Sequence, residues 1–311
     1  MDEQKTPTPN SAEESGQAPW QPKHRRRRFG DRKDGRRVRG IHPMRFVLPF
    51  LTKSRADAQN HFEEDIDVTN LEAYLDAKHA EGYTDMGFLH VFMAAYVRTI
   101  ARRPAINRFL AGQHIFARPD VVVVMPVKKK MSLVAPDTLV KVHFDQRDTA
   151  VQVFEKFDSV YRAAIASESK FDRFMVLLKR IPRLFLRMFI AFLQFLDYFG
   201  LMPRWVINIS PFHGSVMITS MGSLGINAIY HHLYNFGNLP VFLSYGRRHA
   251  KTVVNEDGVS EKRYFITLRA VLDERICDGY YYASGFKIMK RMLETPELLD
   301  TEMTQYTEDI D

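Results

Sequence analysis

The sequence predicts a mixed α/β domain. From Ile41 onward, short runs in which apolar residues alternate or are β-branched take turns with longer runs in which apolar residues recur at helical spacing. The chain has 311 residues, of which 45% are hydrophobic and 12% aromatic. This content is enough for a sizeable core, so disorder of the whole chain is excluded. We therefore expect one large domain over residues 41–311.

The two patterns give an expected order of elements. Alternating or β-branched runs bounded by turn residues predict strands, and amphipathic runs predict helices. The expected strands cover residues 61–68, 121–127, 139–144, 215–220, 241–245 and 263–273. The expected helices cover residues 70–80, 86–103, 149–166 and 281–293.

Residues 171–202 form the most unusual stretch, an apolar helical hairpin interrupted by Pro182 and several charges. Its longest uncharged run, from Met188 to Leu196, has nine residues and is too short to span a bilayer. The polar positions 180, 183, 187, 194 and 197 form one narrow stripe, so the rest of the circumference is apolar. Such a helix pair must cover this surface. It can pack against its own domain or a neighbouring subunit, or dock on an anionic membrane surface or an acidic partner.

The basic character of the chain lies in its N-terminal part. The net charge is −3 over residues 1–22 and +8 over residues 23–39, which leaves about +2 of the total of +7 for the remainder. Residues 1–40 have few large apolar side chains, so we expect a disordered basic arm. The run from Lys23 to Arg28 can bind nucleic acid, an anionic membrane surface or an acidic partner, or serve only as a solvated tail.

The expected compartment is the cytoplasm. Cys277 is the single cysteine, so no disulfide can form within the chain, as is usual in a reducing compartment. The polar N-terminus lacks the apolar core of a signal peptide. Docking of the hairpin or the arm on lipid would make the location peripheral to a membrane.

Two segments carry the residues that suggest chemistry. Residues 266–279 read ITLRAVLDERICDG, which predicts a strand that ends at Asp273 and a tight turn at Asp278 and Gly279. Residues 219–225 read TSMGSLG and follow another expected strand. These segments resemble the catalytic domain of the 2-oxoacid dehydrogenase dihydrolipoyl acyltransferases and chloramphenicol acetyltransferase. The family motif His-x-x-x-Asp-Gly matches residues 274–279, with Glu274 at the histidine. The family motif Ser-Asn-Leu-Gly-x-x-Gly resembles residues 219–225.

The resemblance covers about Ile41 to Leu298 and implies an architecture. The expected fold is a chloramphenicol-acetyltransferase-like mixed-sheet sandwich with flanking helices, into which the apolar hairpin is inserted. The family assembles as a homotrimer with the active site between subunits, so a homotrimer is expected here. Coenzyme A or acyl-CoA and the acyl acceptor would enter this site from opposite sides. No metal is expected, because no Cys/His spacing suits zinc.

The resemblance also implies roles for single residues. Glu274 takes the place of the general base, and Thr219 would stabilise the tetrahedral oxyanion. Asp278 is expected to be architectural, holding its loop through an arginine, for which Arg55 is the candidate. A further set is expected at the coenzyme: Ser220, Gly222 and Tyr245. Gly222 and Gly225 are also expected to serve backbone turns.

The replaced histidine leaves two hypotheses, an active acyltransferase and an inactive trimeric scaffold or acyl- or lipid-binding pseudoenzyme. Glutamate side chains ordinarily have a pKa of about 4.3 and histidine side chains about 6.5, so glutamate is the weaker base unless it is desolvated. Arg275 or Arg269 could instead pair with Glu274 and keep it inert. Nucleic-acid binding as the main role rests only on the arm.

Other candidate residues are weaker. His231 and His232 could serve as replacement bases or form a packed pair at a subunit contact. His143 has no partner that the sequence identifies, and Cys277 alone is poor support for a nucleophile. No Walker-type phosphate loop occurs in the sequence.

Overall fold

A computed structural model describes residues 27–128, 137–166, 170–255, 257–304, 306, 307 and 309. The predicted alternation of strands and helices is confirmed, and most expected elements lie within a few residues of their predicted bounds. Residues 1–26, which make up most of the predicted arm, lie outside the described residues.

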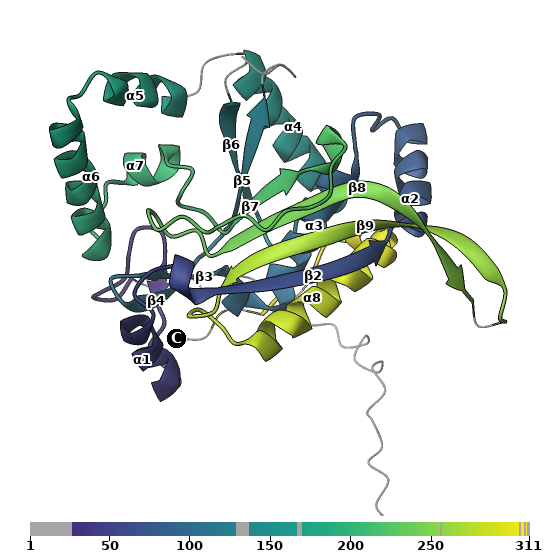
Figure 1. The fold of residues 1–311 in the computed structure, drawn as a ribbon, viewed down its shortest axis with the longest axis horizontal. Coiled ribbons are helices and arrows are strands. Elements are labelled where there is room, and N and C mark those ends of the chain that lie inside the picture. Colours follow the sequence, from purple (N-terminus) through teal and green to yellow (C-terminus); the bar gives the residue numbers. More distant parts are fainter. Residues whose placement is uncertain are drawn as a thin grey trace, which may run out of the picture.

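A six-stranded mixed sheet forms the centre of the molecule. Its strands, in spatial order, are β2 (Gln59–Asp67), β9 (Ser260–Asp273), β8 (Val241–Val254), β7 (Val216–Ser220), β5 (Val121–Lys128) and β6 (Asp137–Phe144). The three neighbours β8, β7 and β5 run parallel, and the remaining pairs are antiparallel. β8 is much longer than predicted, because with β9 it continues as a ribbon that projects from the sheet (Figure 1).

Four helices cover one face of this sheet and enclose the main core. They are α2 (Thr69–Ala80), α3 (Phe88–Arg102), α4 (Ala150–Ala166) and α8 (Gly279–Glu294). α3 lies at the centre, since every residue from Val91 to Ala101 is buried. From the strands, alternate residues such as Ile218 and Leu243 point into this core, as the period of two requires.

The opposite face of the sheet is covered by irregular chain. Phe242 and Val271 pack there against Leu233 and Leu239, which belong to the segment between β7 and β8. The sheet thus has one face covered by helices and one covered by a loop.

Several short elements surround the sheet and were not predicted. They are α1 (Pro43–Leu51), a three-stranded sheet of β1 (Arg36–Arg37), β4 (His114–Ala117) and β3 (Arg108–Ala111), and the 3-10 turns Ala56–Ala58, Pro104–Asn107, Gly222–Leu224 and Pro296–Leu299. Strands of two to four residues are too short to show a period in the sequence.

The predicted apolar hairpin is present as α5 (Lys170–Lys179) and α6 (Arg183–Tyr198), followed by the short α7 (Arg204–Ile209). Figure 1 shows these helices at one side of the molecule, away from α2 and α8. Leu193 packs with Met202, Val206 and Ile207. The other side of α6 is open to solvent, with the large apolar side chains Phe185, Met188, Phe192, Phe195 and Phe199 each more than half exposed.

The prediction of disorder up to residue 40 is wrong for residues 27–40. Arg32 is buried and forms ion pairs with Asp34, at 2.9 Å, and with Asp197 of α6, at 2.6 Å. Val38 packs with Ile115, and β1 pairs with β4. The average composition of residues 1–40 does not reveal these contacts. They offset the conformational entropy that residues 27–40 lose when they become ordered.

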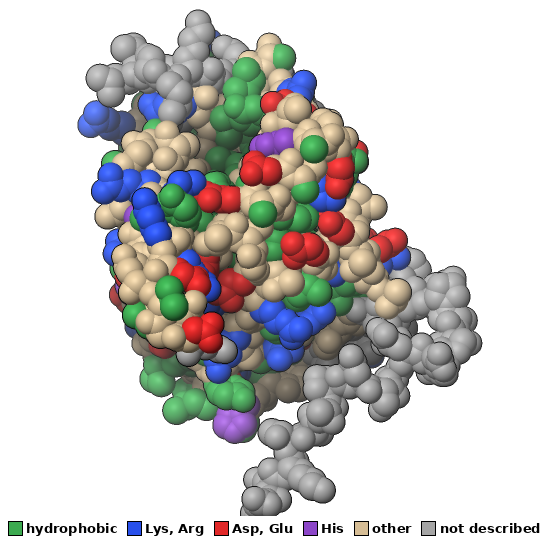
Figure 2. Space-filling model, turned by 90° about the vertical axis from the view of Figure 1, so that its right-hand side faces the viewer, with side chains coloured by type: hydrophobic (Ala, Val, Ile, Leu, Met, Phe, Trp, Pro, Cys, Tyr) green, Lys and Arg blue, Asp and Glu red, His purple; other side chains and the backbone are tan. Residues whose placement is uncertain are grey.

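The face on the side of the projecting β8–β9 ribbon carries acidic and basic side chains interspersed, without one large patch of either sign (Figure 2). Ion pairs of Lys251 with Asp65 and of Arg263 with Asp67 connect this ribbon to β2. In the described part of the chain, no helix combines the length and the apolar character needed to cross a membrane.

Candidate active site

A large open groove lies at the end of β7 and beside the middle of β8, with a volume of about 1090 Å³. Thr219, Ser220, Gly222 and Tyr245 all line it. The structure therefore brings together four of the six site residues that the sequence suggests, including all three expected at the coenzyme.

The parallel pairing of β7 with β8 sets the positions of these side chains. Thr219 lies opposite Ser244, and Ser220 lies opposite Tyr245. The Tyr245 ring stacks on Phe92 of α3 with ring centroids 4.8 Å apart, and its hydroxyl is hydrogen-bonded to the Ser220 side chain. Burial raises the pKa of Tyr245 to about 12, so this hydroxyl is neutral at pH 7. Thr219 is buried, and no hydrogen bond of its hydroxyl occurs among the described residues.

Gly222 allows the turn after β7 to lie directly against β8. A Cβ added to Gly222 would come within 2.6 Å of the Gly246 carbonyl oxygen. Next to this contact the register of β8 shifts between Tyr245 and Arg248. Gly225 ends the turn with a φ of +72°, which favours glycine. Both glycines therefore shape the backbone of the groove wall.

The other walls of the groove come from residues that the sequence analysis missed. They belong to the start of α3, the end of β5 and the middle of α4, represented by His90, Met125 and Phe157. His90 accepts a hydrogen bond from the Gly87 amide at 3.0 Å, and burial lowers its pKa to about 4. These segments precede β7 by more than 50 residues and reach it through the parallel pairing of β5 with β7. No local pattern could have indicated this.

Arg247 is the arginine of the groove that lacks an acidic partner. Arg162 pairs with Asp85 and Asp158, and Arg248 pairs with Glu72. Arg247 is exposed, and no ion pair or hydrogen bond of its side chain is found within the described ranges.

Glu274 does not line the groove. It follows the last residue of β9 and is half-buried, and its backbone amide donates a hydrogen bond to the Ala58 carbonyl at 2.9 Å. Its carboxylate takes part in no ion pair or hydrogen bond among the residues described. The two arginines that could have paired with it bind elsewhere: Arg275 binds Asp273, and Arg269 binds Glu63.

Asp273, which precedes Glu274, is the centre of a buried charge cluster. Its carboxylate is fully buried and accepts hydrogen bonds from Arg275 Nε and Nη2, both at 2.8 Å. Arg55 Nε lies 3.4 Å from the same carboxylate, and the Arg55 guanidinium also donates to the carbonyls of Tyr234 and Gly237. The prediction that Arg55 pairs with Asp278 is therefore wrong, because the nearer carboxylate of Asp273 holds it.

Asp278 caps α8. Its carboxylate accepts a hydrogen bond from the Tyr281 amide at 2.7 Å and pairs with Arg45 at 2.7 Å. The Tyr281 amide and then the Arg45 charge hold the pKa of Asp278 below its usual value. The contacts of Asp278 are those of an architectural residue held by an arginine, and the arginine is Arg45.

Thr219 and Glu274 lie far apart within one chain. Thr219 is in register with Ser244, which is in register with Arg269. Glu274 follows Arg269 by five residues, roughly 17 Å along the strand at about 3.3 Å per residue. Two strand spacings of about 4.8 Å add to this separation. One reacting carbonyl cannot contact both side chains of the same chain.

The remaining candidate residues, two of them histidines in the segment before β8, make contacts typical of structural residues. His231 stacks between Phe242 and His232, with centroids 4.2 and 4.5 Å away, and burial lowers its pKa. Neither histidine lines the groove. His143 has a partner after all, Asp120, at 2.6 Å. Burial raises the pKa of the Cys277 thiol to about 12, so Cys277 is not a thiolate at pH 7.

Over the described ranges, no three His, Cys, Asp or Glu side chains gather as a metal site would require.

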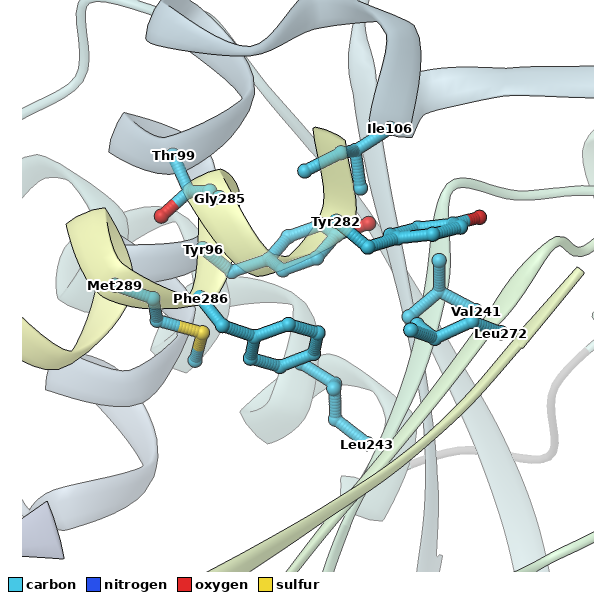
Figure 3. Close-up of a pocket in the computed structure, with 10 residues that line it drawn as sticks. All are labelled: Tyr96, Thr99, Ile106, Val241, Leu243, Leu272, Tyr282, Gly285, Phe286 and Met289. Carbon is cyan, nitrogen blue, oxygen red and sulfur yellow. The ribbon is translucent and has the colours of Figure 1, made fainter. Parts of the chain in front are cut away.

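A second, much smaller cavity belongs to the core. It lies between α3, α8 and the sheet and has a volume of about 10 Å³, room for about one water molecule (Figure 3). Tyr96, Leu243 and Phe286 are among its mostly apolar walls. A Cβ added to Gly285 would come within 2.3 Å of Ile106 Cδ1, so α8 packs closely here. This cavity has no space for an acyl group or a coenzyme.

Comparison with known proteins identifies the fold. No protein-family model matches the sequence, and no curated protein matches it either. Solved structures do match. A probable dihydrolipoamide acetyltransferase from Listeria monocytogenes 4b F2365 is similar with a TM-score of 0.53 and 14% identity, over 84% of this chain and 95% of that chain. The cubic core of the pyruvate dehydrogenase multienzyme complex gives a TM-score of 0.51 and 15% identity, over 85% of this chain and 94% of that chain.

The dihydrolipoamide acetyltransferase of Azotobacter vinelandii gives a TM-score of 0.51 and 16% identity, over 84% of this chain and 94% of that chain. At such identities the similarity establishes the fold. These superpositions lead to one conclusion. The chain has the chloramphenicol-acetyltransferase-like fold of the 2-oxoacid dehydrogenase acyltransferase catalytic cores.

Proposed function

We propose that this protein is an acyltransferase that moves an acyl group between coenzyme A and an acceptor thiol or hydroxyl. The observation that carries the proposal is the groove on an acyltransferase-type fold. Thr219, Ser220, Gly222 and Tyr245 meet there, and these are the positions that the motif resemblance assigns to the oxyanion and the coenzyme.

The residues of the groove suit coenzyme A. The volume of about 1090 Å³ is ample for a long, flexible ligand. Arg247 offers a guanidinium that has no acidic partner among the described residues, which suits a phosphate group of the coenzyme. The neutral Tyr245 hydroxyl and the Ser220 hydroxyl can orient polar groups of the ligand. When bound, coenzyme A supplies the thiol or the thioester.

In the proposed reaction Glu274 removes the proton of the attacking thiol or hydroxyl as its sulfur or oxygen bonds to the acyl carbon. When the tetrahedral intermediate collapses, the bond to the leaving sulfur or oxygen breaks and Glu274 returns the proton to it. The Thr219 hydroxyl donates a hydrogen bond to the oxyanion of the tetrahedral intermediate. In the Azotobacter enzyme a serine, a histidine and an asparagine have been investigated for roles in the catalytic mechanism, and the last two are four residues apart. Glu274 and Asp278 have the same spacing. The Glu274 carboxylate has no ion pair or hydrogen bond among the described residues, which supports its role as the base.

The proposed assembly is a homotrimer in which two copies complete each site. Within one chain Thr219 and Glu274 cannot serve the same carbonyl, because they lie roughly 17 Å apart along the sheet. A neighbouring copy that brings its Glu274 to the groove of the first would remove this difficulty. This arrangement is the one that the family resemblance implies.

Coenzyme A or a suitable acyl-CoA is expected to raise the melting temperature. A ligand that binds only the native state at 100 times its Kd adds about 2.7 kcal/mol of stability. Replacement of Arg247 by alanine should weaken this effect, because one phosphate contact is lost. Thermal denaturation with a panel of acyl-CoAs measures both. Lys287→Ala, which removes an exposed cation of α8, is the matched control and should keep the full shift. No shift with any member of the panel would contradict the proposal.

The second candidate function is an inactive trimeric scaffold that binds an acyl group or a lipid. It is favoured by the glutamate at the histidine position of the motif. In this case acyl-CoA would still stabilise the protein if the groove binds it, but no transfer would follow. Acyl transfer measured with the same acyl-CoAs separates the two functions.

The exposed side of the hairpin suits an anionic membrane surface. The apolar residues Phe185, Met188, Phe192, Phe195 and Phe199 follow each other at intervals of three and four, so they form one stripe along α6. Arg183 and Arg187 lie on the solvent side beside this stripe. The acidic Asp197 faces inward and is held by Arg32. Such a surface fits anionic lipid better than a second copy of itself, whose arginines would repel it. This would place the protein in the cytoplasm, at the periphery of a membrane.

The protein is expected to float with vesicles that contain phosphatidylserine, and less so at high salt. Replacement of Phe185, Phe192 and Phe195 by glutamine should weaken this binding by about tenfold or more, since three large apolar side chains are lost from the lipid contact. Val254→Gln with Val259→Gln is the control, because both residues are equally exposed but lie on the β8–β9 ribbon. Absence of the unaltered protein from the floating fraction would disprove membrane docking.

A further inference from the structure

A cavity separate from the groove lies beside the first half of β5. It has a volume of about 250 Å³. Val122 of β5 and Lys141 of β6 form one wall, and α7 forms another. The groove uses the other end of β5, from Met125 to Lys128, so the two spaces are distinct.

Four cationic side chains line this cavity. Arg118 is buried and Lys141 is half-buried, whereas Lys33 and Arg204 are exposed at the rim. Arg118 is 7% exposed. Cations at this depth require an anion or several hydrogen bonds nearby.

The two acids of the cavity are already paired. Asp34 accepts from Arg32 at 2.9 Å and from the Asn238 side-chain amide at 2.8 Å. Asp120 lies 2.6 Å from His143 Nδ1. Asp34 also serves Arg32, and the four cationic side chains of the lining outnumber its two acidic ones.

Hydrogen-bond donors of the cavity remain without an acceptor. Arg118 donates from Nη2 to Asn238 at 2.8 Å, while its buried Nε has no partner in the part of the chain that is described. His213 is 1% exposed, and its Nε2 lies 3.6 Å from the Asp197 carboxylate, so this nitrogen faces Asp197. Lys141 donates to the carbonyls of Ile207 and Ser210, at 2.6 and 3.0 Å, and so uses two of its three N–H groups.

The pKa of Lys141 is shifted by its burial and by the neighbouring cation. Burial, and then the charge of Arg118, lower its pKa to about 7. An anion between the two side chains would oppose both effects and would keep Lys141 protonated.

We infer that this cavity binds a tetrahedral oxyanion, either free phosphate or the phosphoryl group of a larger molecule. Phosphate offers acceptor oxygens in several directions, which suits donors that reach it from different walls. Arg118 Nε and the third N–H of Lys141 are the donors inside, and Lys33 and Arg204 add positive charge at the opening. Because the opening lies at the surface, a phosphomonoester can enter with its remaining part in solvent.

Isothermal titration of the full chain with inorganic phosphate and with phenyl phosphate tests the inference. Saturable binding of one anion per chain is expected. Tighter binding of phenyl phosphate would identify the ligand as a phosphomonoester, and tighter binding of phosphate would identify the free anion. Acetate should bind at least about tenfold more weakly, because it lacks the third oxygen and the second charge.

Two variants locate the site. Lys141→Met should weaken phosphate binding by about tenfold or more, because a charged hydrogen bond is lost. Arg204→Gln changes only an exposed rim residue, so it keeps the fold and should also weaken binding. Lys262→Met, on the β8–β9 ribbon, is the control and should bind as the unaltered protein does. No saturable binding of either phosphate probe, or binding that both cavity variants leave unchanged, would overturn the inference.

Discussion

Replacement of Glu274 by glutamine is expected to lower the rate of CoA-dependent acyl transfer by about 10²–10⁴-fold, the usual contribution of a general base. Glutamine has nearly the same shape but cannot accept the proton of the attacking thiol or hydroxyl. Because the Glu274 carboxylate has no ion pair or hydrogen bond among the described residues, its loss should leave the fold intact. Steady-state transfer rates, together with melting curves and coenzyme A binding, measure the effect.

Two further variants make this experiment decisive. Glu297→Gln changes an exposed glutamate that does not line the groove and should keep full activity. Glu274→His restores the residue of the family motif and should transfer at least as fast as the unaltered protein, since histidine is the better base at pH 7. Equal activity of the glutamine variant would remove Glu274 from the mechanism.

The same variant tests whether two copies share a site. Thr219→Ala and Glu274→Gln should each be inactive alone. In mixed trimers an intact Thr219 of one copy can meet an intact Glu274 of another, so activity should return on mixing after reversible dissociation. Persistent inactivity of trimers shown to be mixed would contradict a site that joins two copies.

Replacement of Asp273 by asparagine is expected to lower the free energy of unfolding by about 3–5 kcal/mol, because it leaves buried guanidinium groups without a counter-charge. Asp273 is fully buried, and Arg275 and Arg55 beside it are 2% and 6% exposed. The carbonyls of Thr52, Tyr234 and Gly237 satisfy some of their N–H groups but supply no negative charge. Urea denaturation at pH 7 measures the change.

Asp85→Asn is the matched control for this measurement. Asp85 pairs with Arg162 at 3.0 Å, but both side chains are about two-thirds exposed. Loss of such a pair should change stability by about 0.5 kcal/mol or less. An equally small effect at Asp273 would mean that water or the carbonyls alone can stabilise the two arginines.

The central part of the fold could be predicted from the sequence because apolar residues recur in its strands and helices with a clear period. β5 is a β-branched run, and α3 repeats apolar residues over four turns, so both were expected within two or three residues of their observed bounds. β8 was expected to end at Tyr245. It continues for nine more residues as a two-stranded ribbon, whose exposed Arg247, Arg248 and Lys251 give no alternating apolar pattern.

Only those residues of the candidate site that lie in one short stretch of sequence could be predicted. Thr219, Ser220 and Gly222 lie in one motif, and the groove contains them together. The walls from α3, β5 and α4 depend on strand pairing between distant segments. The partner of Asp278 depends on which of two arginines, Arg45 or Arg55, lies nearer after the chain has folded. Spacing in the sequence cannot decide that.

The ion pair between Arg32 and Asp197 has a consequence for where the folding unit begins. The two residues are 165 positions apart, and their ion pair holds the N-terminal segment against α6. A fragment that starts at Ile41, the boundary suggested by composition, would lose Arg32 and leave Asp197 beside His213 alone. The hairpin would then have lost its anchor at the end of α6. The folded unit therefore includes the last part of the basic segment, and residues that precede every strand of the central sheet help to hold the hairpin in place.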